Sequence, residues 1–222
     1  MKKVLGTITV TAALASGAGG CHSHGTTVEQ ETSRPQWVAT EAKTVHPLGE
    51  GAPAPDAVLA GADGKPVKMA SLYTAKPSIL IFYRGGWCPY CNTHLGQIAK
   101  AEPELVAMGY QILAISPDKP EAVHATLDKG DYTYQLLSDS DMVLSKAFGL
   151  AFKVDDPTIA KYRSFGIDLD QASGRSHHLL PVPAVYIVDT KGIIRLAHWN
   201  PDYKARLQPQ ELLDAARRLK GR

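Results

Sequence analysis

The sequence predicts an α/β domain whose mixed central sheet is flanked by helices. Between residues 78 and 148, short apolar runs typical of buried strands alternate with stretches that begin and end like helices. Two further apolar runs follow, joined by a short turn at Lys191-Gly192, and one amphipathic helix closes the chain. Alternating strands and helices favour parallel pairing, whereas a terminal hairpin adds antiparallel strands, so we expect both kinds of pair in one sheet.

Length and composition fit one globular domain with appendages. The chain has 222 residues, of which 44% are hydrophobic and 21% are charged, as in ordinary soluble proteins. The formal net charge is +2, but Lys2 and Lys3 are the only charged side chains in residues 1–20. Without these two lysines, the basic and acidic residues balance at 22 each. A neutral chain without a dense basic patch predicts no nucleic-acid partner.

The first twenty residues have the layout of a secretory signal. Two lysines precede an apolar stretch from Val4 to Ala18, which is too short to span a bilayer permanently. Cys21 follows two glycines, and this site resembles a bacterial lipobox, in which cleavage leaves a lipidated N-terminal cysteine. We therefore expect an exported lipoprotein that faces the periplasm or the cell exterior and is membrane-anchored through Cys21. An ordinary signal peptide cut nearby is the alternative.

The remaining chain divides into a polar segment and a folded domain. Residues 21–48 are polar and show no sustained period, which predicts a flexible tether. The domain should cover residues 49–222 and begin with a hairpin around the Asp63-Gly64 turn. The nearly continuous apolar run at residues 78–83 predicts a buried central strand. A helix should start at Pro89, meet a kink or break at Pro103 and end at Gly109.

The other expected elements follow in order. They are a strand at 111–116, a helix at 120–129, a strand near 134–137, a helix at 139–148, hairpin strands at 184–189 and 193–199, and a helix at 209–220. Between residues 151 and 180 the periodicity is weak, with one helix expected around 158–164. A loop of that length in a compact domain is usually functional, so we expect it to border the active site.

Cys88 and Cys91 form the candidate reactive centre. A structural disulfide between them would close a very short loop and would remove little entropy from the unfolded chain, so the spacing favours a redox dithiol. With Pro89 at the first helical position, Cys88 becomes the N-cap residue. The amides and dipole of a helix start stabilise a thiolate there, which makes Cys88 the expected nucleophile. Cys91, one turn further on, is the expected resolving thiol.

A series of motifs resembles the AhpC/TSA (redoxin) peroxiredoxin-like family of the thioredoxin-like superfamily. The motifs are GEGAPAPDAVLAGADGKPV, FYRGGWCPYC, QILAISPD, LLSD and VPAVYIVDTKGIIR, and the resemblance extends over about residues 49 to 220. It implies a thioredoxin-like fold with an N-terminal hairpin extension. It also implies a thiol-dependent antioxidant oxidoreductase that reduces hydroperoxides without a cofactor, with a thioredoxin-like external dithiol as its reductant.

The resemblance assigns supporting roles and also exposes departures. From the residues alone, Trp87 and Tyr90 are apolar walls that limit water at the site or, as the alternative, ordinary packing aromatics. Pro183 occupies the place of the superfamily's cis-proline, which would leave the Val182 backbone free to pair with a substrate; a trans proline at a strand start is the alternative. Family members carry a threonine three residues before the reactive cysteine and an arginine near the later strand, and both polarise the peroxide. The matching positions here are Gly85 and Pro183.

Three arginines could replace the missing groups. The sequence favours surface or ion-pair roles for Arg84, Arg163 and Arg206, and none is assigned to the site.

Two other functions compete with peroxide reduction. The CxxC spacing also fits an extracytoplasmic thiol-disulfide oxidoreductase that acts on protein disulfides. His177 and His178 precede the Pro183 strand, a placement similar to that in copper-handling relatives that use two cysteines and one histidine, so a copper-binding chaperone is a third hypothesis.

Overall fold

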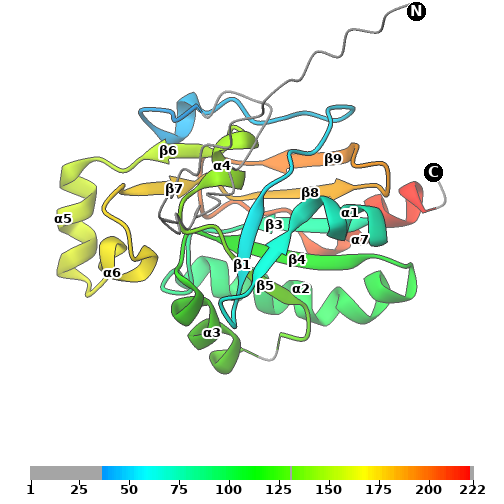
Figure 1. The fold of residues 1–222 in the computed structure, drawn as a ribbon, viewed down its shortest axis with the longest axis horizontal. Coiled ribbons are helices and arrows are strands. Elements are labelled where there is room, and N and C mark those ends of the chain that lie inside the picture. Colours follow the sequence, from blue (N-terminus) through cyan, green and yellow to red (C-terminus); the bar gives the residue numbers. More distant parts are fainter. Residues whose placement is uncertain (1–36, 131, 221–222) are drawn as a thin grey trace, which may run out of the picture.

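A seven-stranded mixed sheet forms the centre of the protein (Figure 1). The computed structural model describes residues 37–130 and 132–220, so the expected signal at residues 1–20 and Cys21 lie outside the described residues. The strand order is β2-β1-β5-β4-β3-β8-β9. Strands β3, β4 and β5 pair in parallel, and every other pair is antiparallel. The expected mixed sheet is therefore confirmed.

The strands of the main sheet are β1 (Val58–Gly61), β2 (Pro66–Lys68), β3 (Ser78–Phe82), β4 (Gln111–Ser116), β5 (Gln135–Ser138), β8 (Ala184–Val188) and β9 (Ile194–Trp199). A second sheet pairs β6 (Ala151–Lys153) with β7 (Leu179–Pro181). The helices are the short 3-10 helix η1 (Ala42–Thr44), α1 (Met69–Ala75), α2 (Pro89–Ala107), α3 (Pro120–Lys129), α4 (Val143–Ala147), α5 (Asp156–Ser164), α6 (Leu169–Ser173) and α7 (Pro209–Leu219).

Helices cover both faces of the sheet, and β3 is therefore buried on both sides. Alternate residues of β3 point to opposite faces. Ile79 and Ile81 join one core cluster with buried residues of α2, α3 and α7, whereas Leu80 and Phe82 join a second cluster with α1 and α4. All five residues of β3 are buried, as the continuous apolar run predicted. This double burial fixes the register of the strand that leads into α2.

Most predicted elements match the structure, but α2 and α4 differ from their predictions, and α1, α6, β6 and β7 were not predicted. Helix α2 starts at Pro89 as expected, but Pro103 does not break it, because Ile98 and Leu105 on either side are both fully buried. Helix α4 is shorter than the predicted 139–148. The Asp139 carboxylate accepts from two amides of its first turn, so this residue caps the helix from outside and does not belong to it.

The proposed tether at residues 21–48 is wrong for its last twelve residues. From residue 37 onward the chain lies against the domain: the Leu48 amide donates to Phe148 (3.0 Å), and Val45 and Leu48 are buried. Ala39 forms a bridge to Phe152 of β6. This strap has no helical or strand period because isolated contacts hold it, and the folded part therefore begins about twelve residues before the predicted boundary at 49.

The weakly periodic stretch at 151–180 is an ordered insertion. It contains β6, α5, α6 and most of β7, and buried Val154, Ile159, Leu169 and Leu180 form its own small core. Trp87, from the loop before α2, packs against this core. The expectation that this segment borders the dithiol is confirmed.

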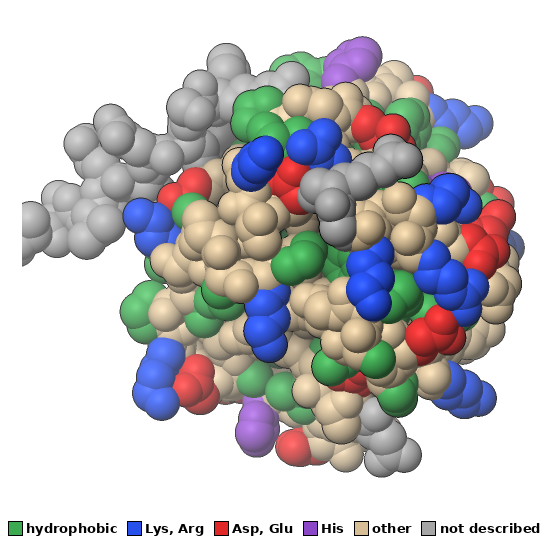
Figure 2. Space-filling view, turned by 90° about the vertical axis from the view of Figure 1, so that its right-hand side faces the viewer, with side chains coloured by type: hydrophobic (Ala, Val, Ile, Leu, Met, Phe, Trp, Pro, Cys, Tyr) green, Lys and Arg blue, Asp and Glu red, His purple; other side chains and the backbone are tan. Residues whose placement is uncertain are grey.

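The described surface shows no strongly basic face in the view of Figure 2, where lysine and arginine side chains are interspersed with acidic, polar and apolar ones. Among the residues that the structure describes, no helix is both long and apolar enough to cross a membrane.

Replacing Gly149 with alanine should destabilise the protein by undocking the strap. Gly149 has a φ of +71°, and an added Cβ would lie 2.1 Å from the His46 carbonyl oxygen. Gly192 is the matched control, because its φ is +73° but no atom lies within 4 Å of an added Cβ. We expect Gly192→Ala to lower the free energy of unfolding by about 1 kcal/mol, and Gly149→Ala by about 2 kcal/mol more. Urea unfolding measures both free energies. An equal loss of stability in the two variants would contradict the conclusion that the strap packs against Gly149.

Candidate active site

The dithiol lies at the N-terminus of α2, directly after the central strand β3. Cys88 is the N-cap residue and Pro89 the first helical residue, as the sequence predicted. The Cys88 carbonyl accepts from the amides of Cys91 (3.0 Å) and Asn92 (3.1 Å), which closes the first turn. Both cysteines are free thiols, and their exposed fractions are only 1% and 0%. The two sulfurs are therefore held at a helix start and shielded from water.

Two glycines allow the tight loop that precedes the dithiol. Gly85 has a φ of +140°, and an added Cβ would lie 2.3 Å from Nε1 of Trp87. An added Cβ on Gly86 would lie 1.9 Å from Oγ1 of Thr126 in α3. The threonine that family members carry at the position of Gly85 has no room here. Because these two glycines have no side chains, the loop backbone can lie close to its neighbours.

The same loop is tied to β4 and to α2 by hydrogen bonds. The Gly86 amide donates to Oδ2 of Asp118 (2.7 Å), which follows β4, and Nδ2 of Asn92 donates to the Gly86 carbonyl (2.8 Å). Asp118 is 2% exposed, and its burial raises the pKa of the carboxyl to about 7. A buried acceptor of this kind holds the start of α2 in one place.

The two thiols have opposite electrostatic environments. A hydrogen bond from the Cys91 thiol, the positive charge of Arg84, the Cys91 amide and Arg206 together lower the pKa of Cys88 to about 6, although burial opposes them. Burial, together with hydrogen bonding and charge repulsion from Cys88, raises the pKa of Cys91 well above its ordinary value. The first sulfur is therefore poised as a thiolate and the second as a thiol that donates to it.

Arg84 belongs to the site, so its predicted surface role is wrong. Its side chain is 4% exposed and lies in a cage of three aromatic rings, with distances from its guanidinium carbon to the ring centroids of 4.2 Å (Tyr203), 5.0 Å (Trp87) and 5.5 Å (Tyr162). Nη2 of Arg84 also donates to the Tyr162 hydroxyl. The three rings come from three parts of the chain: the loop before α2, the 151–180 insertion and the segment after β9.

Arg206 also lies at the dithiol, whereas Arg163 does not. Nη2 of Arg206 donates to the sulfur of Cys91 (3.4 Å), and its Nε donates to the Tyr203 carbonyl (2.8 Å). Arg163 pairs with Asp170 at 3.5 Å on the surface, as the sequence predicted. The sequence gives no local signal for Arg206, because 115 residues separate it from Cys91.

Of the predicted aromatic walls, Trp87 is partly buried and packs on Tyr162, with ring centroids 5.6 Å apart. Tyr90 is 47% exposed and meets the Tyr203 ring edge-on at 5.6 Å. Tyr90 therefore lies at the rim of the site and does not seal it.

The expected cis peptide bond before Pro183 is wrong. All peptide bonds among the described residues are trans. Strand β7 ends at Pro181 and β8 begins at Ala184, so Val182 and Pro183 connect the two strands through trans peptide bonds. The Val182 amide already donates to the Leu150 carbonyl (2.9 Å), so it is not free to bind a substrate. Pro183 itself lines a cavity of about 210 Å³ together with Arg84 and Tyr203.

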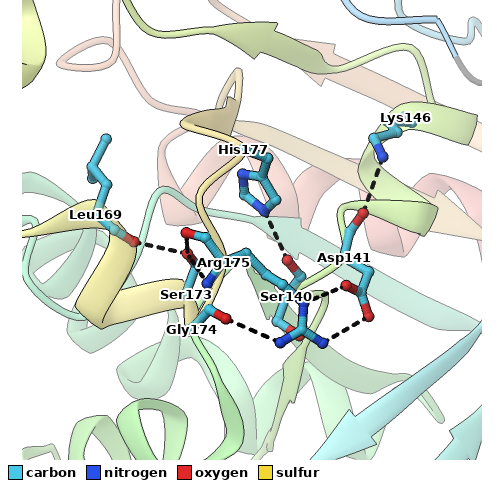
Figure 3. Close-up of polar contacts among 8 residues, drawn as sticks. All are labelled: Ser140, Asp141, Lys146, Leu169, Ser173, Gly174, Arg175 and His177. Atoms are coloured by element: carbon cyan, nitrogen blue, oxygen red, sulfur yellow. Dashed lines mark hydrogen bonds and ion pairs between the residues drawn. The ribbon is translucent and has the colours of Figure 1, made fainter.

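The two histidines are committed to other partners. Nδ1 of His177 accepts from the Leu179 amide (2.9 Å), so its Nε2 donates to the Ser140 carbonyl (2.8 Å; Figure 3). Burial lowers the pKa of His177, which fits a neutral ring. Nε2 of His178 lies 2.8 Å from a carboxylate oxygen of Asp170. Within residues 37–130 and 132–220, no group of three or more His, Cys, Asp or Glu side chains could hold a metal ion.

This fold and this site define a thiol-dependent oxidoreductase of the thioredoxin-like class. The chain belongs to the AhpC/TSA family, whose sequence model matches residues 51–197.

Relatives and solved structures agree with this family. The chain is 29% identical over 106 residues to a putative peroxiredoxin bcp of Haemophilus influenzae, covering 48% of this chain and 68% of the relative. It is 25% identical over 174 residues to the chloroplastic peroxiredoxin Q of Suaeda salsa, covering 78% of this chain and 68% of the relative. A putative peroxiredoxin of Mycobacterium tuberculosis is 32% identical, with 46% of this chain and 64% of the relative covered. The chain thus spans about two thirds of the length of these relatives.

Two crystal structures show the same fold at low sequence identity. Peroxidoxin BcpB from Mycobacterium tuberculosis superposes with a TM-score of 0.61 at 17% identity, covering 78% of this chain and 99% of that one. Reduced Prx3 from Vibrio vulnificus in complex with hydrogen peroxide gives a TM-score of 0.63 at 18% identity, with 76% and 99% covered.

The pH dependence of the alkylation rate of Cys88 should report the lowered pKa of its thiol. Only the thiolate reacts, so the rate of labelling with iodoacetamide should fall as the pH drops through about 6 and should reach a plateau above it. Removing a neighbouring cation favours the protonated form, so Arg84→Gln should move the midpoint upward by about one unit. Arg163 is a surface arginine, so Arg163→Gln should leave the midpoint unchanged. A wild-type midpoint near the ordinary thiol value of about 8.5 would contradict this electrostatic interpretation.

Proposed function

We propose that the protein is a thiol peroxidase that reduces hydroperoxides with Cys88 and recycles through Cys91. One observation carries this proposal: Cys88 caps the start of α2 near the buried Arg84, with the buried Cys91 one helical turn away, and this arrangement lowers the pKa of Cys88 and raises that of Cys91. Membership of the AhpC/TSA family and the similarity to relatives named peroxiredoxins support the same reaction.

The reaction uses the two sulfurs in turn. The Cys88 thiolate attacks one peroxide oxygen, the O–O bond breaks, and the other oxygen leaves and takes up a proton as water or an alcohol. Cys88 is then a sulfenic acid. Cys91 attacks its sulfur, a disulfide forms, and the hydroxyl group departs as water. An external dithiol of the thioredoxin-like kind reduces the disulfide by thiol exchange.

The two arginines supply positive charge where the usual threonine is missing. Gly85 has no room for a side chain, so no hydroxyl can reach the peroxide from that position. Arg84 and Arg206 both act electrostatically on Cys88. A guanidinium beside the attacked O–O bond stabilises the charge that develops on the leaving oxygen.

A second candidate function is the exchange of protein disulfides outside the cytoplasm. The hydrogen bond between the thiols of Cys91 and Cys88 favours it, because the second sulfur lies ready to release a mixed disulfide. The trans bond before Pro183 and the occupied Val182 amide weaken it, since they remove the expected backbone partner for a polypeptide.

Peroxide turnover should depend on Cys88 and be modified by Cys91. With a dithiol donor, we expect the wild type to consume hydrogen peroxide or an alkyl hydroperoxide, and Cys88→Ser to lose this activity because the nucleophile is gone. Cys91→Ser should still form the sulfenic acid, which a carbon nucleophile can trap for mass spectrometry. Consumption by the wild type no faster than by Cys88→Ser would refute the peroxidase. Insulin reduction measured on the same three proteins tests the second candidate.

We also propose export and a lipid anchor on Cys21. The lipobox-like sequence and the apolar stretch before it support this proposal. Full-length protein expressed in a bacterium should fractionate with membranes, and Cys21→Ser should move it to the soluble exported fraction. Recovery of the wild type in the cytoplasm, still carrying residues 1–20, would rule out export.

A further inference from the structure

Arg206 contacts the sulfur of the second cysteine and not that of the nucleophile. Its Nη2 donates to Sγ of Cys91 at 3.4 Å. The chemistry of Cys88 does not require this contact, because Arg84 lies closer in sequence and has a larger electrostatic effect on Cys88 than Arg206 has. Both arginines therefore act on Cys88 through their charge, and Arg206 also donates a hydrogen bond to Cys91.

We infer that Arg206 is a catalytic residue for the resolving step, in which its guanidinium pairs with the Cys91 sulfur as that sulfur becomes a thiolate and attacks Cys88. This inference rests on the proposed dithiol chemistry of the site. In this inference, Arg206 stabilises the Cys91 thiolate during its attack on Cys88, and Arg84 has no part in that step.

Cys91 needs such a partner because it is fully buried. Its exposed fraction is 0%, and an unpaired thiolate at that depth is costly. The thiolate must nevertheless form, since it is the thiolate and not the thiol that attacks a sulfenic acid or a disulfide. A hydrogen-bonded cation lowers this cost most effectively.

The other groups that face Cys91 do not supply this cation. They are Cys88 at the N-cap of α2, Tyr83 directly after β3, Asp118 after β4, and the Arg84 amide in the loop between β3 and α2. His94 on α2 interacts with Arg206 itself. Negative charge on Cys88 or Asp118 disfavours a second anion. Burial raises the pKa of Tyr83, and burial and Arg206 lower the pKa of His94 to about 4, so both are neutral at physiological pH. The Arg84 amide donates a hydrogen bond but carries no charge.

Arg206 is held in place from both sides. Its Nε donates to the Tyr203 carbonyl (2.8 Å), and its own carbonyl accepts from Nε2 of Gln208 (3.0 Å). The next residue, Leu207, is buried, and its carbonyl accepts from Nε2 of His94 on α2 (3.1 Å). The segment between β9 and α7 is therefore fastened to the helix that carries both cysteines. A guanidinium anchored in this way loses little entropy when it pairs with a new charge.

The step balances without any further reactant. Cys91 loses its proton, its sulfur forms a bond to the sulfur of Cys88, and the S–O bond of the sulfenic acid breaks. The departing hydroxide takes a proton and leaves as water. Cys91 is oxidised as the sulfenic acid is reduced to the disulfide level. A mixed disulfide at Cys88 is resolved in the same way, with a thiolate as the leaving group.

A peroxide-free experiment isolates this step. Dithiodipyridine is an uncharged disulfide that releases one thiopyridone when Cys88 attacks it and a second when Cys91 resolves the mixed disulfide. Stopped-flow absorbance separates the two releases. Arg206→Met should slow the second release roughly tenfold near pH 7 and should move its pH midpoint up by about one unit, since one unit of pKa is a tenfold change in thiolate. The first release should change far less, because Arg84 remains beside Cys88.

Two variants control for charge and for folding. Arg206→Lys keeps the cation and should restore most of the second rate at neutral pH. Arg163→Met removes an arginine that pairs with Asp170 on the surface and should behave as wild type in both phases. Circular dichroism and urea midpoints verify that each variant is folded. If Arg206 only holds the loop, both phases should change without a shift in the pH midpoint, and this result would overturn the inference, as would an unchanged second phase in Arg206→Met.

The result is independent of the proposed peroxidase. If the wild type reduces no peroxide but Arg206→Met still slows the second release, the peroxidase fails and the role of Arg206 stands. If the wild type consumes peroxide normally but Arg206→Met leaves the second release unchanged, the peroxidase stands and the role of Arg206 fails.

Discussion

The hydrogen bond from the Gly86 amide to the buried carboxylate of Asp118 fixes where α2 begins. It joins the loop after β3 to the residue that follows β4, and these strands are parallel neighbours whose carboxyl ends meet at one edge of the sheet. Asn92 closes the same loop from the helix side. Because Gly85 and Gly86 carry no side chains, the backbone can approach its partners closely enough for these bonds to form. The N-cap position of Cys88, and with it the electrostatics of the site, depends on this arrangement.

Charge is distributed unequally around the two sulfurs, and this asymmetry gives the dithiol its direction. Cys88 accepts hydrogen bonds from the Cys91 thiol and amide, and the positive charges of Arg84 and Arg206 further stabilise its thiolate. Cys91 is the more deeply buried sulfur and has Arg206 as its one side-chain hydrogen-bond donor among the described residues. The aromatic cage holds Arg84 in a site with almost no exposure to water, where a charge acts more strongly than it would at the surface. This asymmetry supports the proposal that Cys88 reacts first and Cys91 second.

The insertion and the strap shape the surroundings of the dithiol. The insertion contributes Tyr162, which packs on Trp87 and accepts from Arg84. The strap donates a hydrogen bond to Phe148 and bridges to β6, so it is attached to the first strand of the insertion. The segment after β9 adds Tyr203 from a third direction. The insertion and the segment after β9, which are distant in sequence, thus both pack on the loop that precedes α2.

Local patterns were sufficient to predict the dithiol and its setting, because the cysteine spacing, the proline that starts α2 and the apolar runs of the central strands all act within a few residues. The motif series was sufficient for the family as well. Other features become visible only in the folded protein. Arg206 reaches Cys91 across 115 residues, and the strap is ordered by isolated contacts with no period. Periodicity and spacing report interactions between near neighbours in the chain, whereas these features arise from packing between distant segments, which a single sequence does not encode in any local pattern.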